Sequence, residues 1–70
     1  MTHRTIEYMG YCLELDLSQN VATVTRGGYE AELHELEKTC ELRNARGKPH
    51  RVASWIVGDL ANTAYREGLK

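Results

Sequence analysis

The chain has 70 residues, a formal net charge of −1 and two cysteines in no paired motif. At this length we expect a single domain that spans residues 1–70, with no room for a second. The near-neutral charge excludes a strong global field that would attract nucleic acid or an acidic membrane, and the cysteine count excludes a secreted disulfide framework, although one disulfide is possible. No apolar leader follows Met1 and no apolar run is long enough to span a membrane, so we expect a cytoplasmic protein with reduced thiols and no membrane partner.

The small size of the chain favours a partner. A chain of this length buries only about 60% of the surface that its unfolded form exposes, so the domain is marginal alone. Small domains usually add disulfides, a metal or oligomerisation, and we therefore expect a homodimer.

The first third of the chain predicts a β-hairpin. Residues 11–17 alternate apolar and polar side chains, which is the pattern of a strand with one buried face. Residues 21–25 are short and β-branched and predict the returning strand. A turn at residues 18–19 would set Leu15 opposite Ala22, with both on the apolar face.

Ahead of this hairpin, residues 5–8 also alternate, but their apolar positions have the opposite parity. Met9 and Gly10 stand where the parity changes. Either a β-bulge or a tight turn fits there, because glycine is the usual residue at both.

The segment after Gly27-Gly28 allows more than one interpretation. As a strand it forms a hairpin with Val24 opposite Ala31, and a hybrid would place a strand over residues 29–34 before a helical turn. As a helix over residues 29–43 it places four residues on one stripe, at spacings of three and four: Tyr29, Leu33, Leu36 and Cys40. We favour the helix, because this stripe continues where the period of two fails.

The C-terminal segment predicts the main helix, over residues 50–67. Pro49 suits a helix start and Gly68 suits a helix end. Gly58 costs about 1 kcal/mol relative to alanine, so tertiary contacts must support the middle of the helix. Its core face consists of Val52, Ala53, Ile56, Val57, Leu60 and Ala64, with Ala61 at the edge.

The opposite face of this helix carries the only tryptophan among polar residues. We define the Trp55 stripe as the residues at steps of three and four on this face: Arg51, Trp55, Asp59, Asn62 and Arg66. Either a strand, a loop or the Arg51 guanidinium covers the indole, or the indole anchors a partner, because Trp and Arg are enriched in interface hot spots. The Trp55 stripe is the candidate partner-binding site.

A basic segment without acids follows a run of glutamates. We define this basic loop as residues 43–51, with five basic side chains: Arg43, Arg46, Lys48, His50 and Arg51. Arginines beside a helix N-terminus suit phosphate, so the loop is a candidate nucleic-acid site. The competing interpretation is that these charges pair with the glutamates or simply solvate the loop. No zinc-finger, helix-turn-helix or aromatic RNA-platform pattern accompanies them.

A metal or acid–base site could draw by residue type on Cys12, His34, Cys40 and His50. Their spacings match no zinc motif, because structural zinc sites usually bring their ligands in close pairs. No nucleophile elbow or glycine-rich phosphate loop is present. We therefore predict no metal, no cofactor and no enzymatic activity.

The run Tyr8-Met9-Gly10-Tyr11, followed by strands and a helical segment, resembles the start of small bacterial antitoxin domains of the HicB type. The resemblance is confined to this run and to an element order that many folds share. The rest of the chain departs from the pattern, including the lack of a clear added DNA-binding segment. What the resemblance implies is a regulatory or toxin-neutralising role.

These patterns predict an α+β domain in which a small antiparallel β-meander of two to three strands packs against the C-terminal helix, with an intervening helix. The predicted core consists of Leu13, Leu15, Leu17, Ala22, Val24, Leu33, Leu36, Val52, Ile56, Val57, Leu60 and Ala64. The function we expect is a non-enzymatic interaction or regulatory module, acting on a protein partner or itself through the Trp55 stripe. The alternative is a nucleic-acid-binding regulator, antitoxin- or repressor-like, that uses the basic loop.

Overall fold

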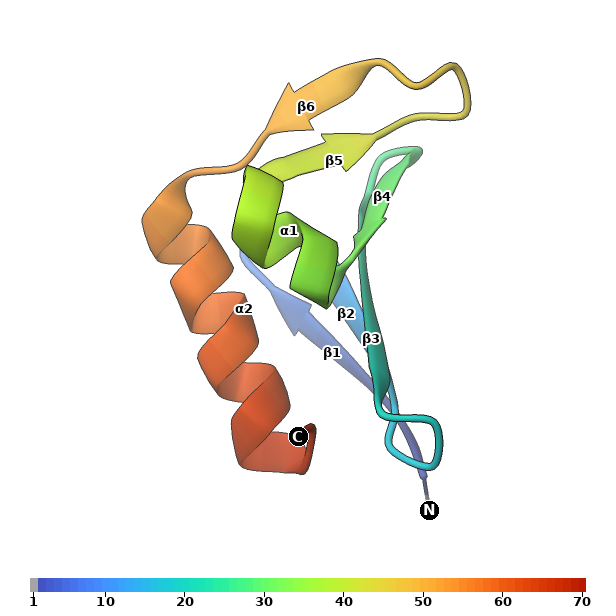
Figure 1. Cartoon of the computed structure of the whole chain (residues 1–70), viewed down its shortest axis with the longest axis vertical. Helices are drawn as coiled ribbons and strands as arrows, with labels where there is room; N and C mark the ends of the chain where they lie inside the picture. The colour runs from blue at the N-terminus through green and yellow to red at the C-terminus, as the bar shows by residue number, and fades with distance from the viewer. Residues whose placement is uncertain (1) are drawn as a thin grey trace.

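The computed structural model describes residues 2–70, and within them the chain forms an antiparallel six-strand meander and two helices (Figure 1). The elements are β1 (His3–Tyr8), β2 (Tyr11–Asp16), β3 (Val21–Arg26), β4 (Tyr29–Glu32), α1 (Leu33–Thr39), β5 (Glu41–Arg43), β6 (Pro49–Arg51) and α2 (Ser54–Glu67). Each strand pairs with its neighbour in the sequence. Helix α2 runs beside the sheet, with α1 between it and β4 (Figure 1). The α+β class and the packing of the C-terminal helix on a meander are confirmed, with more strands than predicted.

Local chemistry sets the first two turns. Met9 and Gly10 both have positive φ, 48° and 85°, as the two central residues of a tight hairpin turn require. The parity change is therefore a turn and not a bulge. In the next turn, one carboxylate oxygen of Asp16 accepts bonds from the Ser18 hydroxyl and two backbone N–H groups. The predicted register, with Leu15 opposite Ala22, is confirmed.

The prediction of a helix over residues 29–43 is wrong for most of that span. Tyr29–Glu32 continues the sheet as β4, and α1 covers only Leu33–Thr39. Cys40 then takes a left-handed conformation, with φ of 56°, and its N–H bonds back to the Leu36 carbonyl. This residue ends the helix and redirects the chain into β5. The hybrid interpretation came nearest, because a strand at Tyr29–Glu32 is followed by a helix, which begins two residues earlier than the hybrid placed it.

The main helix starts later than predicted. Pro49–Arg51 pairs with β5 as the edge strand β6, where a missing N–H is tolerated. The Val52 N–H bonds to the Cys40 carbonyl at 2.8 Å and extends this pairing by one residue. Helix α2 has 14 residues and ends at Gly68 as predicted. Neither α2 nor α1 combines the length and apolar composition that a bilayer crossing needs.

The core lies between the sheet and the two helices. Of the predicted core, Leu17 and Ile56 are only partly buried, and the other members are buried. The residues that sequence patterns missed are Tyr11, Leu42, Ala61 and Leu69. Leu42 enters the core only because β5 replaces the predicted helix. Leu69 is buried because its N–H bonds to the Ala64 carbonyl, which folds the end of the chain back over α2.

Candidate functional site

Strand β1 lies along α2 and determines which part of the helix is covered. Arg4 lies 2.9 Å from the Glu67 carboxylate, and the Tyr8 hydroxyl donates to Asp59. The strand advances four residues between these two contacts and the helix eight. At the usual rise per residue, these steps span about 13 Å along β1 and about 12 Å along α2, so the two elements run side by side. Extending this alignment past Tyr8 places the β1–β2 turn next to the first turn of α2.

The side chain of Trp55 is open to solvent. Trp55 and Met9 are each 57% exposed, and the progression of β1 along α2 places them at the same end of the helix. The cation–π pair found in residues 2–70 joins Arg26 to Tyr11 and does not involve the indole. The interpretation that a strand, a loop or the Arg51 guanidinium covers Trp55 is therefore wrong.

The Trp55 stripe is not continuous. Arg51 lies on β6, where it pairs with Glu41 of β5, and so does not belong to the helix. Asp59 is partly buried where it accepts the Tyr8 hydroxyl. This hydrogen bond raises the pKa of Tyr8, because ionisation would remove the donated proton and set two anions together.

The exposed residues of α2 are Ser54, Trp55, Gly58, Asn62, Tyr65 and Arg66, and the last five of them are here named the α2 outer face. Within residues 2–70, apart from its chain neighbours and the nearby backbone of α2, no atom lies within 4 Å of the position that a Cβ would occupy on Gly58. The hydroxyl of Tyr65, which is 41% exposed, donates to the Glu37 carboxylate of α1 at 3.1 Å. This hydrogen bond raises the pKa of Tyr65 and fixes the ring at the border of the face.

Asn44 shapes the basic loop, which forms the β5–β6 hairpin at the top of Figure 1. Its side-chain oxygen accepts bonds from the N–H groups of Arg46 and Lys48, at 3.0 and 2.9 Å. Its backbone N–H and carbonyl bond to the Lys48 carbonyl and the Gly47 N–H. The loop is therefore an ordered turn that displays its cations.

The basic side chains of the loop differ in whether they pair with a carboxylate. Arg43 lies 3.2 Å from the Glu41 carboxylate and also donates to the Gly47 carbonyl. Across residues 2–70, no ion pair involves Arg46, Lys48 or Arg51, and all three are exposed. The interpretation that these charges pair with the preceding glutamates thus holds for Arg43 alone.

A hollow of about 230 Å³ opens between the β3–β4 turn and the basic loop, lined by Arg26, Gly27, Tyr29 and His50. The rings of Tyr29 and His50 lie 5.2 Å apart at an interplanar angle of 40°. The Arg26 guanidinium lies 4.8 Å from the centre of the Tyr11 ring. Arg26 and Tyr29 were missed by sequence reasoning, because only the pairing of β5 with β6 brings His50 to this place.

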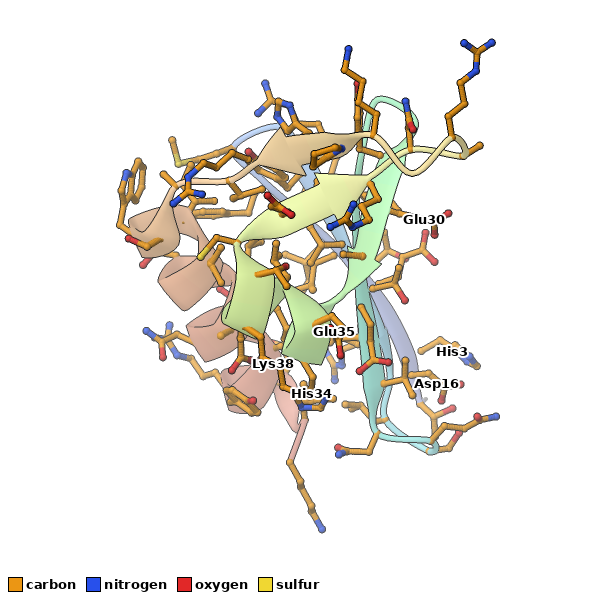
Figure 2. All side chains as sticks on the ribbon, turned by 45° about the horizontal axis from the view of Figure 1, so that its top comes forward. His3, Asp16, Glu30, His34, Glu35 and Lys38 are labelled. Carbon is orange, nitrogen blue, oxygen red and sulfur yellow. The ribbon has the colours of Figure 1, made fainter. Side chains whose placement is uncertain are left out.

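The residue types considered for metal or acid–base chemistry do not converge. Within the described chain no three His, Cys, Asp or Glu side chains form a group that could hold a metal ion. Cys12 and Cys40 are free thiols and partly buried. Figure 2 shows His34 on α1, away from His3, which lies against Asp16 at an end of the sheet. His34 instead lies 3.2 Å from the adjacent Glu32 carboxylate.

A second hollow, beside α1, is mostly acidic: Glu30, Glu32, Glu35 and Glu41 line it together with Ala31, Thr39 and Arg43. Figure 2 shows Glu30 and Glu35 on neighbouring elements there. Arg43 already bonds to Glu41 at its rim.

Comparison of the chain with protein-family models, curated proteins and solved structures gives no match. Function is therefore argued from the surfaces described above.

Proposed function

We propose that the chain is a non-enzymatic interaction module that forms a homodimer through the α2 outer face. The observation that carries the proposal is the exposure of Trp55, with 57% of its surface open at the end of α2 where the equally exposed Met9 also lies. Tryptophan is enriched in interface hot spots, and a chain of this size gains stability from oligomerisation. A net charge of −1 gives little repulsion between two copies.

The α2 outer face is self-complementary when two copies meet antiparallel. Trp55 lies near the start of α2, Tyr65 and Arg66 lie near its end, and Gly58 and Asn62 lie between. A two-fold axis at the middle of the helix would bring each indole onto Tyr65 and Arg66 of the other copy, giving aromatic and cation–π contacts. Gly58 has no side chain, which allows the two helices to approach closely there.

Sedimentation equilibrium over a range of protein concentrations tests this proposal. The wild-type chain is expected to form a dimer, and Trp55→Ala to weaken it about 30-fold, the equivalent of about 2 kcal/mol for a hot-spot residue. Arg66→Ala is expected to have a smaller effect in the same direction.

Val21→Ala is the matched control, because Val21 is an exposed apolar residue, 36% exposed, on β3 and outside α2. It is expected to leave the dimer constant unchanged. A mass equal to one chain at every concentration would exclude the homodimer. Equal weakening by Val21→Ala would exclude the α2 outer face as its interface.

A second candidate function is nucleic-acid binding by the basic loop. The observation that favours it is the absence of any ion pair to Arg46, Lys48 and Arg51 within residues 2–70. Free cations on an ordered hairpin suit phosphate contacts. The double charge reversal Arg46→Glu with Lys48→Glu should reduce binding to labelled duplex DNA and lower the salt slope by about 2. No retention of DNA or RNA at low salt would exclude this function.

A further inference from the structure

We propose that the hollow between Arg26, Tyr29 and His50 is a stacking site for one base of a single-stranded nucleic acid, whose phosphates lie along the basic loop. This inference rests on the second candidate function, and it adds a ligand class and residues outside the basic loop.

The hollow has the composition that recognises a base by its face. Tyr29 and His50 form a tilted aromatic pair with ring centroids 5.2 Å apart. Arg26 also lines the hollow, and its guanidinium lies over the Tyr11 ring. Aromatic rings and arginine planes are the groups on which proteins stack unpaired bases. Among the residues that the structure describes, no carboxylate lines the hollow.

The phosphate groups would find cations on the same hairpin. His50 lies on β6, and Lys48 and Arg46 directly precede this strand in the turn that Asn44 holds. A strand of nucleic acid with its base in the hollow would therefore pass Arg46 and Lys48, two of the three cations of the basic loop that have no ion-pair partner within residues 2–70. A duplex cannot use the hollow, because its bases are stacked on one another and turned inward.

The experiment measures fluorescence anisotropy of labelled oligo(U), oligo(dT) and a duplex of equal length at low salt, with the whole chain. We expect the single strands to bind more tightly than the duplex, and Tyr29→Ala to weaken single-strand binding at least about 5-fold, as loss of one stacked base does. Tyr29→Phe should retain the affinity. Val21→Ala changes an exposed residue of β3 that belongs neither to the hollow nor to the α2 outer face, and it should leave binding unchanged. The two single strands show whether a 2′-hydroxyl contributes.

Tyr29 is partly buried, so His50→Ala provides a second variant at an exposed residue of the same ring pair. Binding that is equal for duplex and single strand, and unchanged in Tyr29→Ala and His50→Ala, would overturn the stacking site while leaving phosphate binding by the basic loop. No binding of any of the three probes would overturn both. If Tyr29→Ala fails to fold, an unchanged affinity of His50→Ala is the result that overturns the stacking site.

Discussion

The sheet has two regions that are built differently. From β1 to β3 the strands are six residues each, with six residue pairs between β1 and β2 and five between β2 and β3. From β4 to β6 the strands have three or four residues, and β4 meets β5 at a single position, Glu30 opposite Arg43. The first region is held by a continuous ladder, whereas that single position joins β5 and β6 to the rest of the sheet, and Leu42 is the one buried side chain among the residues of β4, β5 and β6.

This difference teaches where the candidate surfaces arise. The basic loop, its stacking hollow and the start of α2 all belong to the second region or adjoin it. There the chain turns at Cys40 and again at Asn44, and each change of direction exposes side chains that a longer strand would have aligned. Short elements and local turns position Arg46, Lys48 and Trp55 at the surface. The long strands of the first region provide the platform.

Leu13→Ala in β2 is expected to have the largest effect on stability. Leu13 is fully buried in the core, on the face of the sheet that both helices cover. Leucine-to-alanine changes at such sites lower the free energy of unfolding by about 2–5 kcal/mol. Denaturant unfolding followed by circular dichroism measures it. Glu14→Ala, the exposed neighbour on the other face, is the control and should change stability by less than about 0.5 kcal/mol.

Leu42→Ala should separate the two regions. Leu42 is the buried residue of β5, and its loss is expected to cost about 2 kcal/mol. Because the second region has so little ladder, amide hydrogen exchange should accelerate in β5 and β6 more than in β2 and β3. Equal acceleration in all four strands would show that the sheet opens as one unit, and the distinction between regions would fail.

The same distinction explains how far sequence patterns predict this fold. Residues 11–17 have one clear period and a turn held by Asp16, so their register follows from local chemistry. Residues 29–43 have a period of two and then a period of about 3.6, each for too few residues to decide. The left-handed Cys40 that resolves the conflict has no sequence signal, because non-glycine residues rarely adopt that conformation.

The candidate surfaces follow the same division. Trp55 was placed on the outward face of its helix from periodicity alone, and its exposure agrees with that prediction. Asp59 was placed on that face too, but its bond to Tyr8 depends on β1 lying along α2, a long-range contact that local patterns do not contain. The hollow requires three elements to meet, so sequence reasoning could not assemble Arg26, Tyr29 and His50.

Two glycine-to-alanine substitutions, one in the β1–β2 turn and one in α2, should change the free energy of unfolding in opposite directions. Gly10→Ala in the β1–β2 turn should destabilise by about 1 kcal/mol, because Gly10 has φ of 85°, although the nearest atoms, of Arg26, leave room at 3.8 Å. Gly58→Ala should stabilise by about 0.5–1 kcal/mol, because this helical position is open and has no unusual φ. Chemical denaturation at a concentration where the chain is monomeric measures both. A destabilising Gly58→Ala would contradict the expectation that an open helical position gains from alanine.

The smallest expected effect is a dependence on pH at the β2–β3 turn. The Ser18 hydroxyl bond is the main cause that holds the pKa of Asp16 below its usual value, aided by the Gln19 N–H and by His3, whose ring nitrogen lies 3.3 Å away. A carboxyl with a lowered pKa in the folded state adds stability above its unfolded pKa, and this contribution is lost as pH falls through the folded pKa. Asp16→Asn keeps one side-chain oxygen as the acceptor for the turn, removes the charge, and puts an amide NH2 in place of the oxygen that faces His3.

The variant should therefore be less stable than wild type at neutral pH, and the difference in unfolding free energy should shrink as the pH is lowered through the acid range, because wild-type Asp16 then also becomes neutral. Glu14→Gln on the same strand is the matched control, since its side chain makes no hydrogen bond within residues 2–70, and its difference from wild type should stay small throughout. A deficit in Asp16→Asn that stays constant from neutral to acid pH would mean that the turn depends on the geometry of the acceptor and not on its charge. The register of β1 to β3 would then depend on the shape of the turn and on the strand pattern alone.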